Sequence, residues 1–223
     1  MIRLHHCHQT RSMRTLWLLN ELDVDFEIVV HPFDKSLRSP DYLTLHPVGR
    51  VPALELDGEV LWETGAITEV LCERFPRAGL GRSAGDPDRA DWLIWVHFAE
   101  TISQHTAALT QQHIALYDDA MRSPTVMKLE AKRLEKCLDA IEARLSRPIE
   151  APDYLLTSGF SAADISAGQA VYMARHFVKT EAHPALTAWY ARLETRPGFR
   201  AALPPDGAER LYDKAFYAPW GPR

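Results

Sequence analysis

Glu63 and Thr64 stand side by side where the apolar spacing predicts that a helix begins, running from Glu63 to Phe75. The first turn of a helix has backbone N–H groups without helical partners, so it can hold an anion, and the Thr64 hydroxyl adds a further donor. This pair therefore predicts a site for the charged end of a small ligand.

Val51 and Pro52 lie just ahead of a predicted hairpin. Its strands are the apolar-rich runs 53–56 and 59–62, because Asp57-Gly58 between them is a strong two-residue turn signal. A proline at the start of a strand cannot supply a ladder N–H. A cis bond, the minority state of such bonds, would turn the Val51 backbone outward to pair with an extended peptide. Together with the acid-hydroxyl pair, the Val51-Pro52 step predicts a binding site for a small anionic peptide.

The whole segment, HPVGRVPALELDGEVLWETGAI from His46 to Ile67, resembles the glutathione site of the cytosolic glutathione S-transferase superfamily. The resemblance implies that Val51 pairs with the cysteinyl backbone of glutathione and that Pro52 is the cis-proline. It also implies that Glu63 and Thr64 hold the γ-glutamyl end. The family usually has Glu-Ser here, so threonine keeps the hydroxyl and adds a methyl group.

A glutathione transferase needs a donor aimed at the glutathione sulfur, because a free thiol titrates near about pH 8.5 and is mostly protonated at neutral pH. The segment HQTRSMRTLW, residues 8–17, resembles the NSRSxRVLW pattern of bacterial members, and alignment on Arg14 and Trp17 puts Thr10 in the place of the sulfur ligand. Ser12 is the alternative ligand. A third interpretation, that both hydroxyls only cap the helix, stays open.

Three cations are candidates for the rest of the ligand. Arg11 stands where some relatives contact the thiolate or substrate, although a solvated surface arginine fits equally well. Lys35 and Arg50 are candidates for the glycyl carboxylate, because point charges suit an exposed carboxylate. Arg14 is expected to tie the two domains together, without a catalytic role.

The run His5, His6, Cys7 and His8 does not predict a metal site. Successive side chains of a strand point to opposite faces, so the four cannot converge, and no second cluster with ligand spacing follows. Cys7 is expected to be a bystander, because the thiol-dependent members of the family carry their cysteine where this chain has residues 10–12. Glutathione is therefore the expected co-substrate, and no metal is expected.

The N-terminal third alternates between strand and helix patterns. Ile2 and Leu4 indicate a strand, residues 12–22 a helix, and residues 26–30 a second strand. Such a βαβ unit should have parallel strands with a right-handed crossover. Residues 31–47, with three prolines, are expected to be irregular.

The remainder reads as almost entirely helical, over residues 88–116, 126–145 and a helix opened by a Ser161–Asp164 capping box. The expected fold class is therefore an α/β thioredoxin-like domain (βαβ-ββα) followed by an all-helical domain. The expected boundaries are residues 1–78, a Gly- and Pro-rich linker at 79–87, and residues 88–223. The aromatic tail after Pro204 could cover a pocket or lack a fixed place.

Composition limits the possible partners. The 223 residues carry 25 Lys+Arg against 30 Asp+Glu without a dense basic stripe, which speaks against nucleic acid. No apolar run approaches the roughly 20 residues that cross a bilayer. No signal-peptide pattern opens the chain, and the three cysteines are widely spaced, so a cytoplasmic protein is expected.

The resemblance implies a homodimeric glutathione transferase whose activated thiolate attacks a small hydrophobic electrophile or a peroxide. Two alternatives stay open. One is a glutathione-dependent disulfide reductase that works without a cysteine, and the other is a non-enzymatic member that binds a ligand or partner protein.

Overall fold

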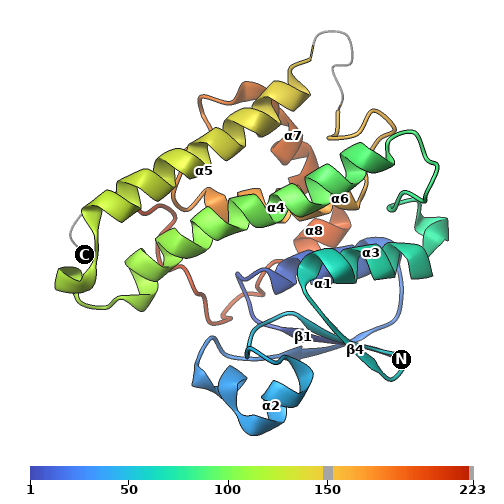
Figure 1. Cartoon of the computed structure of the whole chain (residues 1–223), viewed down its shortest axis with the longest axis horizontal. Coiled ribbons are helices and arrows are strands. Elements are labelled where there is room, and N and C mark those ends of the chain that lie inside the picture. The colour runs from blue at the N-terminus through green and yellow to red at the C-terminus, as the bar shows by residue number, and fades with distance from the viewer. Residues whose placement is uncertain (148–152, 221–223) are drawn as a thin grey trace. The chain divides into compact units, whose positions relative to one another are not determined.

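The computed structural model describes residues 1–147 and 153–220, and the chain divides into two compact units (Figure 1). The first unit contains residues 1–92 together with residues 194–211. The second contains residues 93–193 and the residues from Tyr212 onward. The domain boundaries expected from the sequence stay a prediction.

The first unit is built on a four-stranded mixed sheet with the strand order β2-β1-β3-β4. Its strands are β1 (Ile2–His6), β2 (Glu27–Val30), β3 (Ala53–Leu56) and β4 (Glu59–Trp62). β1 is parallel to β2 and antiparallel to β3, and β3 is antiparallel to β4. Leu4 pairs with Ile28 on one side and Leu54 on the other and is fully buried. The predicted βαβ unit and Asp57-Gly58 hairpin are both confirmed.

Helices cover both faces of this sheet (Figure 1). They are α1 (Ser12–Leu22), α2 (Pro40–Leu45), α3 (Thr64–Arg74) and α8 (Pro197–Ala201), with short 3₁₀ turns at Lys35–Arg38 and Pro76–Ala78. His6 bonds to Ser12 of α1, whereas its neighbour His5 contacts Tyr42 of α2. Because neighbouring residues of a strand point to opposite faces, α1 and α2 lie on opposite sides of the sheet.

The expectation that residues 31–47 are irregular was wrong. This stretch contains the 3₁₀ turn Lys35–Arg38 and helix α2. Each begins with a side-chain cap: the Asp34 carboxylate accepts from the backbone N–H of Ser36, and the Ser39 hydroxyl accepts from that of Tyr42. Capping and a proline at the first helical position thus stabilise elements too short to show a hydrophobic period.

The chain returns to the first unit near its C-terminal end. Arg196 donates two hydrogen bonds to the Glu21 carboxylate of α1, at 2.9 and 2.6 Å, and the Phe199 ring packs edge-on against Trp17. Gly198 faces the same carboxylate, and a Cβ atom there would lie 2.7 Å from Glu21 Oε1. α8 is therefore a structural part of the α/β unit, held on α1 by an ion pair and an aromatic contact.

The second unit is helical. It contains most of α4 (Arg89–Thr110), which continues as a π-helical turn at Gln111–Ala115, followed by a 3₁₀ turn at Asp119–Met121, α5 (Pro124–Leu145), α6 (Ala162–Ala174) and α7 (Pro184–Glu194). Every residue of α6 except Tyr172 is buried, which identifies α6 as the central helix. Four of its residues are alanines in the run AADISAGQA, so much of its surface is formed by small side chains. The expected fold class is confirmed.

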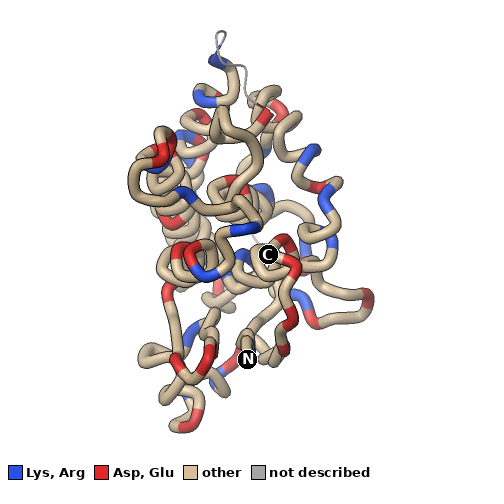
Figure 2. The backbone as a smooth tube through the Cα atoms, turned by 90° about the vertical axis from the view of Figure 1, so that its right-hand side faces the viewer, with Lys and Arg blue, Asp and Glu red and all other residues tan. Residues whose placement is uncertain are grey.

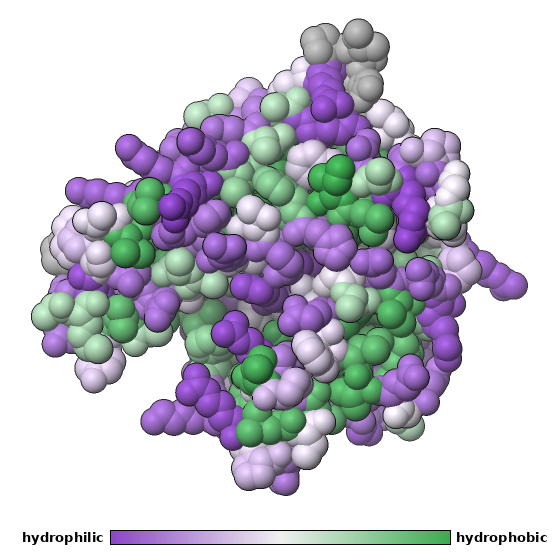
Figure 3. Space-filling model, viewed as in Figure 1, coloured by the Kyte–Doolittle hydropathy of each residue, from purple (hydrophilic) through white to green (hydrophobic). Residues whose placement is uncertain are grey.

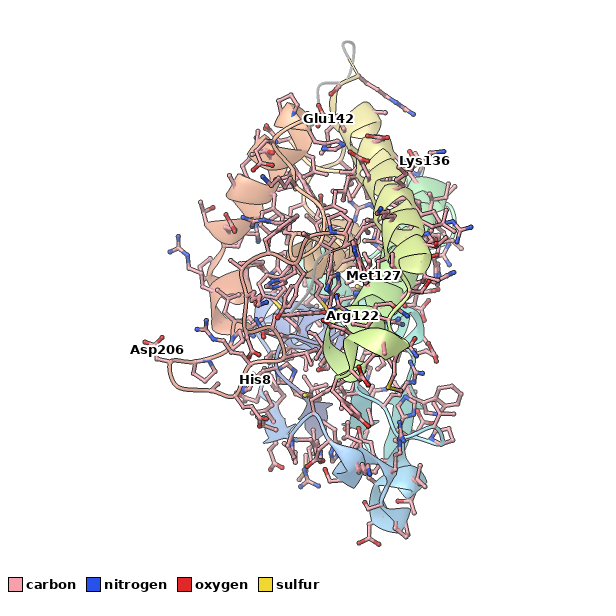
Figure 4. All side chains as sticks on the ribbon, turned by 90° about the vertical axis from the view of Figure 1, so that its left-hand side faces the viewer. His8, Arg122, Met127, Lys136, Glu142 and Asp206 are labelled. Atoms are coloured by element: carbon pink, nitrogen blue, oxygen red, sulfur yellow. The ribbon has the colours of Figure 1, made fainter. Side chains whose placement is uncertain are left out.

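Two carboxylates hold this unit together. Asp164 forms the predicted capping box with Ser161, accepts from the backbone N–H of Leu155 at 2.9 Å and accepts from Trp189 Nε1 at 2.9 Å. Burial raises the pKa of Asp164 to about 6 against the opposing effect of these donors. Glu142 of α5 accepts from two N–H groups at the start of α7, at 3.2 and 2.8 Å (Figure 4).

The tail packs on the helical unit over residues 212–217. The buried Tyr212 shares a hydrogen bond with Thr110 at 2.8 Å and stacks on His176 with 4.2 Å between ring centroids. The N–H of Tyr217 donates to the His176 carbonyl at 2.7 Å. This part of the tail therefore covers the ends of α4 and α6.

Charge is distributed evenly along both units, with acidic and basic residues interspersed (Figure 2). Among the helices of the described residues, none has the length and apolar character needed to span a bilayer.

Replacing Asp164 should be severely destabilising. Asp164→Ala leaves the N–H groups of Leu155, Ser161 and Trp189 buried without an acceptor, and we expect a loss of about 3–5 kcal/mol in the free energy of unfolding. Urea denaturation measures this change. Asp118→Ala, which removes an exposed cap of a 3₁₀ turn, should cost less than about 1 kcal/mol. Equal effects of the two substitutions would contradict the role given to Asp164.

Candidate active site

The Val51-Pro52 peptide bond is cis, and two neighbouring contacts hold the turn that precedes it. Tyr42 of α2 donates from its hydroxyl to the carbonyl of Arg50 at 2.7 Å. Gly49 has a φ of +61°, and a Cβ atom there would collide with the carbonyl oxygen of Leu37. The turn before the cis bond is therefore clamped between α2 and the 3₁₀ turn that contains Leu37.

Glu63 and Thr64 open α3. Glu63 is the exposed N-cap residue, with a φ of +73°, and Thr64 is the first helical residue, only 4 % exposed. The first helical hydrogen bond runs from the Ile67 N–H to the Glu63 carbonyl, so the N–H groups of residues 64–66 precede the helical ladder. The predicted anion-binding helix start is therefore formed next to an exposed carboxylate.

Arg14 positions the Thr64 hydroxyl. Its Nη1 donates to Thr64 Oγ1 at 3.0 Å, and both side chains are buried. Both residues belong to the first unit, and the expectation that Arg14 ties the two domains together stays a prediction. A guanidinium can only donate, so the Thr64 oxygen accepts here and its own proton can be donated to another group.

Thr10 and Ser12 lie together at the junction of β1 and α1. Their hydroxyl oxygens are 2.8 Å apart. Ser12 is fully buried, accepts from the backbone N–H of Cys7 at 3.1 Å and lies 2.8 Å from His6 Nδ1. Ser12 is not an N-cap, because α1 begins at Ser12 itself and its hydroxyl turns back toward β1. The capping contact comes from Thr10, whose oxygen accepts from the Ser12 N–H at 3.3 Å.

His6 was missed as a site residue by the sequence analysis, which weighed it only as a metal ligand. Its Nε2 lies 3.2 Å from His8 Nδ1, and the ring is fully buried. Burial, with a smaller effect of the neighbouring His8, lowers the pKa of His6 to about 3. The ring is therefore neutral at physiological pH, with one nitrogen donating and the other accepting.

His46 is a buried histidine that two of the predicted ligand residues affect electrostatically. It is only 4 % exposed, and burial lowers its pKa. The Glu63 carboxylate opposes that shift and the Arg50 guanidinium adds to it, so both charges act on this ring. His46 carried no signal in the sequence that would have distinguished it from other loop residues.

The remaining predicted residues occupy different surroundings. Arg11 is half-buried just before α1. Lys35 is exposed at the start of the 3₁₀ turn that packs against Gly49, and Arg50 is exposed next to that glycine. The structure thus brings Thr10 and Ser12 into contact and places Glu63 and Arg50 near enough to His46 to affect its pKa.

The histidines of β1 separate as strand geometry requires. His5 pairs with His31 at 2.9 Å and with Glu55 at 3.0 Å, on the face opposite to His6. Within residues 1–147 and 153–220, no group of three or more His, Cys, Asp or Glu side chains could hold a metal ion. Cys7 is buried, and burial, with smaller effects of Glu209 and Asp34, raises its pKa to about 11.

Comparison with known proteins adds independent observations. The model "Glutathione S-transferase, N-terminal domain" matches residues 1–72, and the model "Glutathione S-transferase, C-terminal domain" matches residues 107–192. A probable glutathione S-transferase of Oryza sativa subsp. japonica is 30% identical, over 82% of this chain and 86% of the relative. Glutathione S-transferase 3 of Schizosaccharomyces pombe is 27% identical, over 96% of this chain and 89% of the relative.

Solved structures agree with the sequence relatives. A sphingomonad glutathione S-transferase, itself complexed with glutathione, superposes with a TM-score of 0.74 at 27% identity. The match covers 90% of this chain and 96% of that one. Family models in both halves, full-length relatives and the shared fold all agree: the chain belongs to the cytosolic glutathione S-transferase superfamily and is an enzyme of that class.

Proposed function

We propose that the protein binds glutathione in its first unit and activates the glutathione thiolate for attack on a small hydrophobic electrophile or a peroxide. The observation that carries the proposal is the cis Val51-Pro52 bond. The hairpin of β3 and β4 connects this bond to the start of α3, where the Thr64 hydroxyl is buried. In this proposal residues 1–78 bind glutathione, residues 79–87 are the linker and residues 88–223 supply the pocket for the second substrate. The glutathione complex of the sphingomonad relative supports the choice of ligand.

Each part of glutathione has a partner in this proposal. The Val51 backbone pairs with the cysteinyl peptide unit, with Pro52 setting its direction. The Glu63 carboxylate binds the γ-glutamyl ammonium group, and the Thr64 hydroxyl with the first N–H groups of α3 binds the γ-glutamyl carboxylate. Arg50 or Lys35 binds the glycyl carboxylate, since both are exposed cations beside the clamped turn.

Thr10 is the proposed donor to the sulfur, with Ser12 supporting it. Lowering the thiol pKa by two units requires about 2.7 kcal/mol, and one hydrogen bond to a charged group contributes roughly 1.5–3 kcal/mol. The Ser12 hydroxyl is fully buried and already contacts His6, Thr10 and both backbone groups of Cys7. Thr10 is slightly exposed, at 7 %, and is therefore better placed to meet a ligand. Arg11 at the same junction is a further candidate contact for the ligand.

The proposal includes a cytoplasmic homodimer. In the first unit, Val60 and Trp62 of the edge strand β4 are 38 % and 44 % exposed. Figure 3 shows an apolar area over this part of the unit. Exposed apolar surface on an edge strand is the type of surface that a second subunit covers.

Loss of the Glu63 carboxylate should weaken glutathione binding. Because a charge-assisted hydrogen bond contributes about 1.5–3 kcal/mol, we expect Glu63→Gln to raise the dissociation constant for glutathione about 10-fold to 100-fold in calorimetry. Glu59→Gln is the matched control, since it removes an exposed carboxylate from the hairpin, and should leave affinity unchanged. Similar losses in both variants, or none in either, would place the γ-glutamyl end elsewhere.

Removal of the Thr10 hydroxyl should affect chemistry more than binding. Thr10→Val keeps the branched shape, so we expect the dissociation constant, measured at a pH below the pKa of the bound thiol, to stay within about twofold while that pKa rises by one to two units. The pH profile of kcat then moves to higher pH by the same amount, because the thiol loses its proton only at higher pH. Thr10→Ser should restore most of the activity. If Ser12→Ala shifts the profile and Thr10→Val does not, Ser12 is the sulfur ligand.

Cys7 should be dispensable. Its raised pKa keeps it a thiol at neutral pH, so Cys7→Ala should retain full activity with an electrophilic substrate and with a disulfide substrate.

Assays of the wild type with both substrate classes also separate a glutathione transferase from a disulfide reductase. Activity of the wild type on disulfides alone would identify a disulfide reductase, and glutathione binding without turnover would identify a binding protein.

A further inference from the structure

Four hydrogen-bonding side chains form a continuous chain that ends at Thr10. His8 Nδ1 lies 3.2 Å from His6 Nε2, and His6 Nδ1 lies 2.8 Å from Ser12 Oγ. Ser12 Oγ lies 2.8 Å from Thr10 Oγ1. The two inner members, His6 and Ser12, are fully buried. The outer members reach toward the surface, since Thr10 is 7 % exposed and His8, labelled in Figure 4, is half-buried.

The hydrogen bonds of this series can all point in either of two directions, because each bond contains a single proton. A neutral imidazole has one N–H group and a hydroxyl has one O–H group. When His6 donates from Nδ1, the Ser12 proton goes to Thr10 and the Thr10 proton points onward. In the opposite direction Thr10 donates to Ser12, Ser12 donates to His6, and Thr10 presents only lone pairs to a ligand. The tautomer of His6 therefore decides whether Thr10 donates or accepts at its outer side.

A bound thiolate favours the first direction. Ser12 Oγ accepts from the Cys7 N–H at 3.1 Å, and when His6 Nδ1 also donates to it, the Ser12 proton is left for Thr10 or for the Cys7 carbonyl. Thr10 Oγ1 also lies 2.8 Å from that carbonyl. A charged sulfur is a stronger acceptor than a neutral carbonyl. The Thr10 hydroxyl therefore donates to the thiolate when Ser12 and His6 donate in the outward direction.

We propose that His6 is a positioning residue: by donating from Nδ1 to Ser12 it directs the hydroxyl protons outward, so that Thr10 donates to the sulfur of bound glutathione. This inference rests on the proposed role of Thr10. His6 does not touch the ligand in this scheme. It acts through Ser12, and His8 completes its environment by donating to the other ring nitrogen.

The test compares two substitutions of His6. His6→Leu removes both ring nitrogens, and His6→Asn restores one N–H near the position of Nδ1. We expect His6→Leu to raise the pKa of the bound glutathione thiol by about one unit, a roughly 10-fold loss of thiolate at pH values below that pKa. Glutathione affinity should stay within about twofold, and His6→Asn should recover most of the shift. The thiolate absorbance of the complex as a function of pH gives the pKa, and calorimetry gives the affinity.

A double-mutant cycle and a control separate positioning from general destabilisation. If His6 acts through Thr10, His6→Leu combined with Thr10→Val should raise the thiol pKa no further than Thr10→Val alone. Additive shifts would contradict the proposal. His183→Leu changes another buried histidine, one in the second unit that bonds to Asp139, and should leave the thiol pKa unchanged after thermal denaturation has shown a folded protein.

Nitrogen-15 NMR of the His6 ring reads the tautomer directly in the wild type, even if His6→Leu fails to fold. A protonated Nδ1 in the glutathione complex supports the proposal, and a protonated Nε2 overturns it. A wild type that binds no glutathione, or whose bound thiol keeps an ordinary pKa, overturns the proposed function itself. A wild type with a depressed thiol pKa that Thr10→Val raises and His6→Leu does not overturns the role of His6 alone.

Discussion

The first unit depends on satisfying the polar groups that are buried where β1 ends and α1 begins. Both backbone groups of Cys7 are used there: its N–H donates to Ser12, and its carbonyl accepts from Thr10. A buried backbone group without a partner costs about 1–3 kcal/mol, so the two hydroxyls are structural requirements before they are chemical ones. Gln9, with a φ of +55°, makes the turn that lets them fold back on the strand. The position of Thr10, the proposed sulfur ligand, is thus fixed by the end of β1.

The two ends of the proposed glutathione site are connected through the same helix. α1 begins beside Thr10, and Arg14 in its first turn donates to Thr64 at the start of α3. Burying an arginine is costly unless its donors are used, and the Thr64 hydroxyl is one acceptor that Arg14 reaches. A shift of α1 would therefore move Thr10 and Thr64, the proposed ligands of the sulfur and of the γ-glutamyl end, together. In the proposed site, this connection couples the positions of the two ligand groups.

The sequence predicted the elements whose signals are local. The Asp57-Gly58 turn, the alternation in β1 and the spacing in α1 each specify an element within a few residues, and the structure confirms all three. The prediction for residues 31–47 was wrong because a 3₁₀ turn of four residues and a helix of six are too short to display a helical period in the sequence. The contact between Arg14 and Thr64 was not predicted, because the two lie 50 residues apart and no pattern in the sequence indicates which distant hydroxyl a buried arginine meets.

The residues proposed to carry the chemistry could be chosen from the sequence by type, whereas their partners in the structure could not. Family resemblance indicated hydroxyls at positions 10 and 64, and in both places this chain has threonine where serine is usual. A β-branched side chain has fewer accessible rotamers than serine, so less freedom is lost when the hydroxyl is fixed in one direction. Thr10 and Thr64 each meet a buried polar partner, Ser12 and Arg14, that holds the hydroxyl oxygen. The extra methyl groups are therefore compatible with the proposed roles, because in both positions the direction of the hydroxyl matters more than its mobility.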